Sequence, residues 1–279
     1  MKNAVSDRAS RMRGAVWGAG HSRSAPGACL TLAALLAAGA VQAQAPTAAA
    51  AAKARPATSK TALVRVPAAT TLDYVVNARV SGMAFKTRAR LVWQREAATY
   101  RAAWTVDVPL MGARTQRSEG AITPAGLAPA RYTESTRRER SATFDTGSAR
   151  IHFSGDRPSA SLLPGTQDRL SVSLQLGALL AAAPARYPAG STVTVHTAGV
   201  RDAEDWHWRV LSDETLRVAG RELPAVRLQR QPRKEGDSRI ELWLGRTLHY
   251  LPVRLRVTEA DGDSADQQLS ALPESAAKP

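Results

Sequence analysis

The sequence predicts an all-β protein, built mainly from an antiparallel twisted sheet, a sandwich or an open barrel, with one helix at about residues 168–183. The first observation is an alternation of apolar and polar residues that recurs through residues 70–258, because successive side chains of a strand point to opposite faces. The second is the Gly and Pro residues between these segments, which favour turns. The third is a single Leu- and Ala-rich segment of helix-forming residues.

The N-terminal half predicts strands that follow one another as an antiparallel meander. Gly82 marks the first turn, and Pro109 ends the third strand. The segment before Gly126 is polar and Arg-rich, which favours an edge or outer strand. A hairpin is expected around a turn at residues 145–148. The preceding strands are expected at residues 72–80, 85–93, 100–108, 113–123 and 126–140.

Residues 168–183 are compatible with two structures. The alternation of large apolar residues from Leu170 to Leu176 suits a strand. Asp168 is a good N-cap, however, and Leu, Gln and Ala are helix formers. Pro184 would end a helix at this point. We predict a helix, because the second half of the segment has no β-branched residue.

The C-terminal half returns to strand patterns. Gly220 predicts a turn, and Pro252 stands at the start of the last strand, where its missing N–H is tolerated. With the N-terminal segments these patterns give about ten to twelve strands. The segments are residues 192–196, 206–210, 216–218, 223–228, 240–244 and 251–257.

Residues 1–43 have the organisation of a secretory signal peptide. Basic residues precede an apolar run at residues 28–41, and a V-Q-A site ends at Ala43. This run is short for a membrane span, although an uncleaved anchor or a buried helix is an alternative. Cys29 lies at the start of this run, whereas the Cys of a lipoprotein follows the run. Cleavage near Ala43 would leave a periplasmic or secreted chain without a thiol or a transmembrane segment.

Two further segments are expected to flank the folded domain at residues 70–258. Residues 44–69 are rich in Ala, Pro and Thr, which predicts a flexible low-complexity linker, or a short helix over the Ala run. Residues 259–279 are acidic and rich in Ser and Ala, which predicts a disordered tail.

The charge and the motifs point away from several functions. The net charge of +14 becomes +10 after cleavage, because residues 1–43 carry five basic residues and one acidic residue. A basic exported protein could meet anionic lipid or glycan, whereas export and the lack of a groove-reading motif argue against nucleic acid. No catalytic motif, metal-ligand spacing or cofactor fingerprint occurs, so we expect no enzyme activity, no metal and no cofactor. The histidines of the cleaved chain are scattered, and the acidic cluster at 202–205 suits a solvated turn.

Two Trp residues suggest a ligand-binding site. Trp206 and Trp208 share one strand face with Val210, and flat aromatic faces stack well on a sugar or a lipid. A purely structural role in the core is the alternative. We expect an apolar pocket beneath the helix, rimmed by Arg. The candidate ligand-binding residues are Trp206, Trp208, Arg209 and Leu174.

Three segments carry a resemblance to a known family. They are GLAPARY at 126–132, DRLSVSLQL at 168–176 and ELWLGRTLHYLPVRLRV at 241–257. In this order they resemble the bacterial envelope family called domain of unknown function 3108, and the last segment is similar to that family's final hairpin. The resemblance covers about residues 70–258 and implies an exported, β-rich domain of unassigned function. It carries over no catalytic residues. Trp243 and Tyr250 in the last segment are expected to have structural roles.

Two function classes follow from these observations. The first is a non-catalytic binding or carrier module for an anionic or apolar envelope ligand, a lipid or a glycan. The second is a structural or assembly factor of the cell envelope that acts through contacts with an envelope protein. An apolar pocket under the helix favours the first class. An exposed apolar patch or an unpaired edge strand favours the second. The oligomeric state has no signature in the sequence.

Overall fold

The computed structural model describes residues 64–108 and 112–273, which all belong to one compact unit. The predicted signal peptide at 1–43 lies outside the described residues. So do most of the predicted linker and the last residues of the predicted tail. Within the described ranges, no helix is both long enough and apolar enough to cross a membrane.

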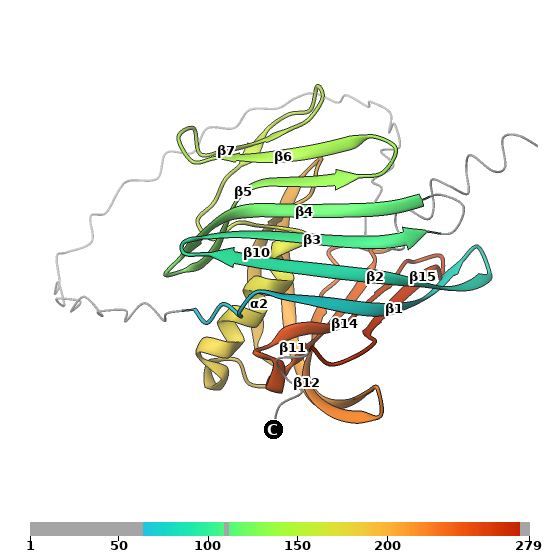
Figure 1. Cartoon of the computed structure of the whole chain (residues 1–279). Coiled ribbons are helices and arrows are strands. Elements are labelled where there is room, and N and C mark those ends of the chain that lie inside the picture. The colour runs from blue at the N-terminus through green and yellow to red at the C-terminus, as the bar shows by residue number, and fades with distance from the viewer. Residues whose placement is uncertain (1–63, 109–111, 274–279) are drawn as a thin grey trace, which may run out of the picture. The chain divides into compact units, whose positions relative to one another are not determined.

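Among the described residues, fifteen strands form one sheet, and one α-helix packs against it (Figure 1). The helix is α2 (Ser171–Ala182), and two short 3₁₀ helices lie at Pro184–Arg186 and Arg246–Leu248. The strands are β1 (Thr70–Val80), β2 (Met83–Glu96), β3 (Thr99–Val108), β4 (Gly112–Thr123), β5 (Gly126–Ser135), β6 (Glu139–Asp145), β7 (Arg150–Phe153), β8 (Ala160–Ser161), β9 (Gln167–Asp168), β10 (Thr192–Ala198), β11 (Ala203–Val218), β12 (Arg221–Arg230), β13 (Arg239–Gly245), β14 (Leu251–Thr258) and β15 (Ser264–Leu269).

Neighbours in the sheet follow the order of the chain, apart from one long-range pair. The order runs from β8 back to β1, continues with β15, and then runs back to β9. Strand β1 therefore pairs with β15 at the centre, for example at Tyr74 and Leu269. The pairs are antiparallel except β9 with β10, which is parallel. Strands β8 and β9, with two residues each, form the edges.

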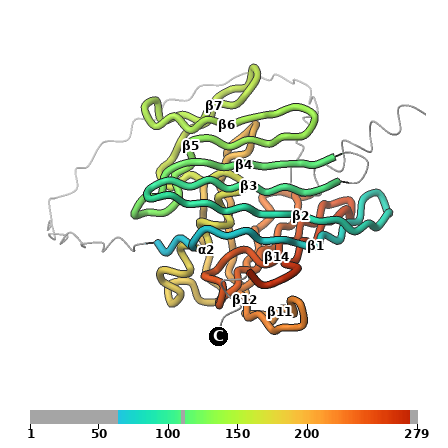
Figure 2. The backbone as a smooth tube through the Cα atoms, in the orientation of Figure 1, coloured from blue at the N-terminus to red at the C-terminus, as the bar shows by residue number. Residues whose placement is uncertain are grey.

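The sheet folds over so that its two halves form layers. Figures 1 and 2 show β1 to β7 as one layer, with β10 to β12 running crosswise behind it. Helix α2 contacts β5 of the first layer and β14 of the second. The helix therefore connects the two layers through its side chains.

The buried side chains form two clusters that share the helix. The first cluster includes Tyr74 and Trp104 of the first layer with Leu174 of α2. The second cluster includes Trp208 of the second layer with Leu176 of α2. A fully buried Leu stabilises the fold by about 1.5 to 3 kcal/mol relative to an exposed one. Helix α2 therefore contributes to both cores at once.

The predicted fold class is confirmed: the protein is all-β, with a mainly antiparallel sheet and one helix. The helix begins at Ser171 rather than at Asp168. Asp168 instead accepts hydrogen bonds through Oδ1 from the backbone N–H groups of Leu170 and Ser171, at 2.9 and 2.7 Å. The carboxylate thus satisfies donors at the start of the helix from the end of β9.

The predicted boundaries of the folded domain are too narrow at the C-terminus. Strand β15 lies within residues 259–279, where a disordered tail was expected, and it pairs with both β1 and β14. Its inward residues are Ala265, Gln267 and Leu269. A stripe of one small, one polar and one large residue gives a weak apolar signal, which explains the wrong prediction.

Two other expectations also differ from the structure. Strand β4, whose Arg-rich sequence favoured an edge or outer strand, lies between β3 and β5. Residues 64–69 of the predicted linker contact the domain, since Val66 packs on the first cluster and the Pro67 carbonyl accepts a hydrogen bond from Trp93 Nε1 at 3.1 Å.

Gly177 provides a test of how closely α2 packs on the sheet. A Cβ built at this position would overlap the carbonyl oxygen of Tyr250. Ala is normally favoured over Gly in a helix by about 1 kcal/mol. We expect Gly177→Ala to lower the free energy of unfolding by about 1–3 kcal/mol instead, because the helix must shift. Urea denaturation measures the change, with Ser173→Ala in the same helix as the control. A Gly177→Ala variant as stable as the wild type would contradict this packing.

Candidate functional site

Two Trp residues of β11 lie side by side on the inner face of the sheet. One residue separates Trp206 from Trp208, so strand alternation directs both inward, and both are buried. Their ring centroids are 6.1 Å apart, and the rings are tilted by 56°. Val210 shares this face, as predicted, and His207 is exposed on the other.

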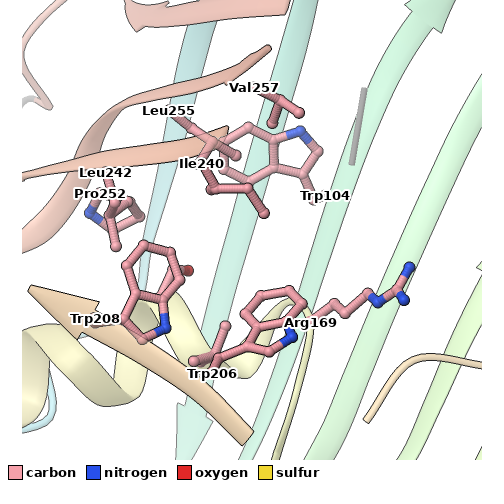
Figure 3. A pocket seen from close by; sticks show the side chains of 11 residues that line it. Trp104, Arg169, Trp206, Trp208, Ile240, Leu242, Pro252, Leu255 and Val257 are labelled. Carbon is pink, nitrogen blue, oxygen red and sulfur yellow. The ribbon is translucent and has the colours of Figure 1, made fainter. Parts of the chain in front are cut away.

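Trp206 and Trp208 line a narrow cavity between the layers (Figure 3). Its volume is about 30 Å³, which is enough for about two water molecules. The walls are apolar except at Arg169 and Ser173. The lining residues are Trp104, Arg169, Val172, Ser173, Trp206, Trp208, Ile240, Leu242, Pro252, Leu255 and Val257.

The structure brings together only two of the four predicted binding residues. Trp206 and Trp208 line the cavity. Arg209 does not, because its position between Trp208 and Val210 places its exposed side chain on the opposite face of β11. Leu174 does not line the cavity either, because it lies on the side of α2 that packs into the first cluster.

Arg169 is the charged residue of the cavity, and the sequence analysis missed it. Its side chain is 10% exposed. Its Nη2 atom donates to Asp202 Oδ1 at 3.4 Å, while Nε has no hydrogen-bond partner among the described residues. A Cβ at Gly199 would lie 2.8 Å from Arg169 Cζ, so the absence of a side chain at 199 makes room for the guanidinium. The sequence signal for a buried Arg169 was its place directly after Asp168. This signal is weak, because the chain has 32 Arg residues.

A second Arg is buried next to the Trp pair. Arg230, on β12, has a side-chain exposure of 0%, and its Cζ lies 4.9 Å from the centre of the Trp206 ring. Its Nη2 atom donates to the Ser238 carbonyl at 2.5 Å and lies 3.2 Å from Asp237 Oδ1. Its Nε and Nη1 atoms have no hydrogen-bond partner among the described residues. A buried donor left without a partner costs about 1–3 kcal/mol.

The charges around Arg230 are strongly coupled. Burial lowers the pKa of Arg230, and the positive charge of Arg169 lowers it further. The negative charge of Asp237 and its hydrogen bond act in the opposite direction. Burial alone would raise the pKa of Asp237, but hydrogen bonds from Arg233 and the charge of Arg230 outweigh it and hold this pKa well below its ordinary value. Asp237 is therefore ionised and balances one of the two neighbouring cations.

Asp168 is the centre of a buried polar network at the start of α2. Its Oδ2 accepts a hydrogen bond from Ser118 Oγ at 2.5 Å, and Ser118 Oγ lies 2.9 Å from the Tyr100 hydroxyl. Burial raises the pKa of Asp168 to about 6, although the hydrogen bonds lower it. A perturbed acid can mark an active site. Asp168 is fully buried, however, and does not line the cavity, so its role is to hold the start of the helix.

The other polar candidates do not converge on one site. The histidines lie on different strands or turns, and the described residues contain no group of three metal-ligating side chains. The acidic residues at 202–205 have separate partners: Asp202 pairs with Arg169, Glu204 with Arg233, and Asp205 with His196.

Trp243 has the structural role that its sequence context predicts. Its ring centre lies 5.2 Å from Arg227 Cζ and 4.6 Å from Arg254 Cζ, both in cation–π range. Its Nε1 donates to Glu214 Oε2 at 2.7 Å. Tyr250 is half-buried and packs on the second cluster.

The fold and the cavity define a β-rich protein whose folded sheet encloses a small Trp-lined space. The chain belongs to the family described as "Protein of unknown function (DUF3108)", which it matches over residues 73–269. The resemblance noted in the sequence is therefore confirmed. The matched range also includes β15. No curated protein matches this sequence.

Several solved structures are similar to this chain at low identity. One is a β-barrel-like protein of domain of unknown function DUF1849 from Brucella abortus, with 13% identity, a TM-score of 0.49, and coverage of 75% of this chain and 98% of that one. A putative outer membrane lipoprotein-sorting protein domain from Vibrio parahaemolyticus has 9% identity, a TM-score of 0.28, and coverage of 76% and 87%. A DUF1329 family protein from Desulfovibrio piger has 10% identity, a TM-score of 0.28, and coverage of 75% and 86%.

The Trp pair is expected to support the core as well as the cavity. Trp206→Ala or Trp208→Ala should lower the free energy of unfolding by about 3–5 kcal/mol, because each removes a large buried side chain. Urea denaturation followed by circular dichroism gives this value. Arg209→Ala, on the exposed face of the same strand, is the control and should change stability little. Unchanged stability in both Trp variants would show that neither ring supports the core.

The raised pKa of Asp168 should make the stability of the fold depend on pH. The carboxyl has a pKa of 3.8 as its ordinary value and about 6 when folded, so the folded state holds the proton more tightly. This contribution to stability is therefore complete below about pH 4 and is lost as the pH rises through about 6. Its size is up to about 3 kcal/mol.

Asp168→Asn is the matched variant for this prediction, because its side chain keeps an acceptor for the α2 backbone and does not titrate. The free energy of unfolding of the wild type should fall relative to Asp168→Asn between about pH 4 and about pH 7. Urea titrations at several pH values measure both proteins. Parallel pH profiles would assign the pH dependence to other groups.

Proposed function

We propose that this protein is an exported, non-catalytic binding or carrier module for an envelope lipid. The observation that supports this is the apolar cavity between α2 and the sheet, with Trp206 and Trp208 on one wall and Arg169 among its lining residues. Binding sites for small molecules are typically apolar, with a few polar groups that orient the ligand. The predicted signal peptide at 1–43 supports export to the periplasm or the cell exterior.

A lipid suits this cavity better than a glycan. Sugars present hydroxyl groups on every side and need many hydrogen-bonding partners, whereas this lining has two polar side chains, Arg169 and Ser173. A non-catalytic role is proposed because none of the lining residues is a His, Cys, Asp or Glu. Those side chains most often supply general acids, bases and metal ligands.

The size of the cavity sets a condition on binding. A volume of about 30 Å³ cannot hold an acyl chain, so binding requires the lining side chains to separate. Val172 and Ser173 of the first turn of α2 are among the lining residues, so a movement of this turn would widen the space. The proposed binding is therefore an induced opening rather than entry into a ready-made tunnel.

The alternative, an assembly factor that binds other envelope proteins, has less support. The exposed large apolar residues of the described chain are Met83 in β2 and Leu163 in the loop between β8 and β9, at 52% and 44% exposure. The edge strands β8 and β9 have two residues each, which offers little backbone for pairing with a partner strand.

Native mass spectrometry of protein recovered from the periplasm of an expressing cell tests the proposal. We expect a bound lipid mass that solvent extraction removes and identifies. The neutral dye N-phenyl-1-naphthylamine then gives a binding assay. Val257→Phe places a ring in the cavity and should weaken dye binding about tenfold or more, since overpacking costs about 1–3 kcal/mol.

Leu163→Phe is the control for this variant, because it adds a ring at an exposed position outside the cavity. It should bind the dye like the wild type. The melting temperatures of both variants show whether they are folded. If Val257→Phe does not fold, Val257→Leu is a milder replacement. Equal dye binding by the wild type and the folded cavity variant would contradict the proposal.

A further inference from the structure

Arg169 extends from the apolar cavity toward a more polar region. Figure 3 shows its side chain running past Trp206, with the guanidinium on the side away from Trp208. The side chain is 90% buried, since 10% of it is exposed, and Nε has no hydrogen-bond partner among the described residues. Its contact with Asp202, at 3.4 Å, is long for a charge-assisted hydrogen bond. One end of the cavity therefore carries a fixed cation with an unused donor.

A further cation, Arg201, lies close enough to Arg169 for the two charges to affect each other. Arg201 lies in the turn between β10 and β11. Burial lowers the pKa of Arg201. The positive charges of Arg140, Arg157 and Arg169 lower it further, and the negative charge of Glu134 raises it. Such mutual repulsion arises where positive charges outnumber their acidic partners. An anion bound among them would reduce this repulsion.

The first turn of α2 lies at the same cavity. Val172 and Ser173 of this turn line it, while the backbone N–H groups of Leu170 and Ser171 are bonded to Asp168. Arg230 is also close enough for its pKa to be lowered by Arg169, and two of its buried donors have no partner among the described residues. Arg169, before α2, and Arg230, over the Trp206 ring, therefore place two cations near one end of an apolar space.

We propose that Arg169 binds the phosphate of a lipid headgroup at this end of the cavity, while the acyl chain lies against Trp206 and Trp208. This inference rests on the proposed carrier function. A guanidinium presents a planar pair of donors that matches the oxygens of a phosphate. The unused Nε of Arg169 is the donor that the headgroup would occupy. Arg201 and its cationic neighbours attract the headgroup without each contacting it.

The test compares lipids that share one acyl chain and differ in the headgroup. The purified full chain is titrated with lysophosphatidic acid and with the uncharged monoacylglycerol, and displacement of N-phenyl-1-naphthylamine gives both affinities. Arg169→Gln should weaken lysophosphatidic acid about tenfold, as expected for one lost charged hydrogen bond. Its affinity for monoacylglycerol should be unchanged. Arg209→Gln removes the same charge from the exposed face of β11 and should change neither affinity.

Two outcomes separate this inference from the proposed function. If neither lipid displaces the dye from the wild type, the carrier function itself is wrong. If both lipids bind, and Arg169→Gln changes their affinities equally or not at all, the headgroup site is wrong and the carrier function stands. An equal loss of lysophosphatidic acid affinity in Arg169→Gln and Arg209→Gln would also overturn the site, because it would reflect net charge alone.

Glycerol 3-phosphate distinguishes a lipid headgroup from a free phosphate compound. It carries the phosphate without the chain, so calorimetry should show binding weaker than that of lysophosphatidic acid by about a hundredfold or more. Equal affinity would assign the site to free phosphate compounds and overturn the headgroup assignment.

A folding control accompanies these titrations. Arg169→Lys keeps the charge and loses the planar donor pair. Its affinity for lysophosphatidic acid should lie between those of the wild type and Arg169→Gln. If Arg169→Gln does not fold, Arg201→Gln at the exposed turn provides the same comparison, with an expected loss of about threefold for the anionic lipid. Unchanged headgroup preference in Arg201→Gln and Arg169→Lys would overturn the inference.

Discussion

The packing of α2 between the two layers is the contact on which the rest of the structure depends. A sheet of fifteen strands folded on itself leaves an interior that strand side chains alone do not fill. The helix supplies apolar residues to both clusters, with Leu174 on one side and Leu176 on the other. It can do so because its apolar residues are not confined to one face. The cavity is the space that remains on one side of this contact, and its shape is set by where the helix lies.

The position of the helix is fixed by polar groups that are costly to bury. Asp168 holds the first backbone N–H groups of α2 and is in turn held by Ser118. Gly177 allows the helix to lie against the chain at Tyr250. The position of Arg169 is therefore fixed by Asp168, which precedes it and is held by hydrogen bonds, and by the helix that follows it. A single short segment thus determines the start of the helix, the packing of the layers and the charge at the cavity.

The sequence was informative where a pattern was regular and uninformative where it was not. Period-two alternation identified the long strands, and it placed Trp206 and Trp208 together on the inner face. It failed for β15, where Gln267 occupies a buried position, and for β4, whose Arg content resembles that of a solvent-facing edge. The site was predictable only in part. Arg169 and Arg230 reach the Trp pair through tertiary packing. In a chain with 32 Arg residues, the place of Arg169 beside Asp168 is a weak local signal, and Arg230 has none.

The pairing of β1 with β15 has a consequence for how the protein forms during synthesis. Most strand pairs join neighbours in the chain, so each half of the sheet can form from local hairpins. The two halves are joined only when the residues near 269 meet those near 74, and such distant contacts form late because they close a long loop. Before β15 forms, the two half-sheets share no strand pair and have open edges at β1 and β14. Strand β15 therefore completes the centre of the sheet rather than its margin.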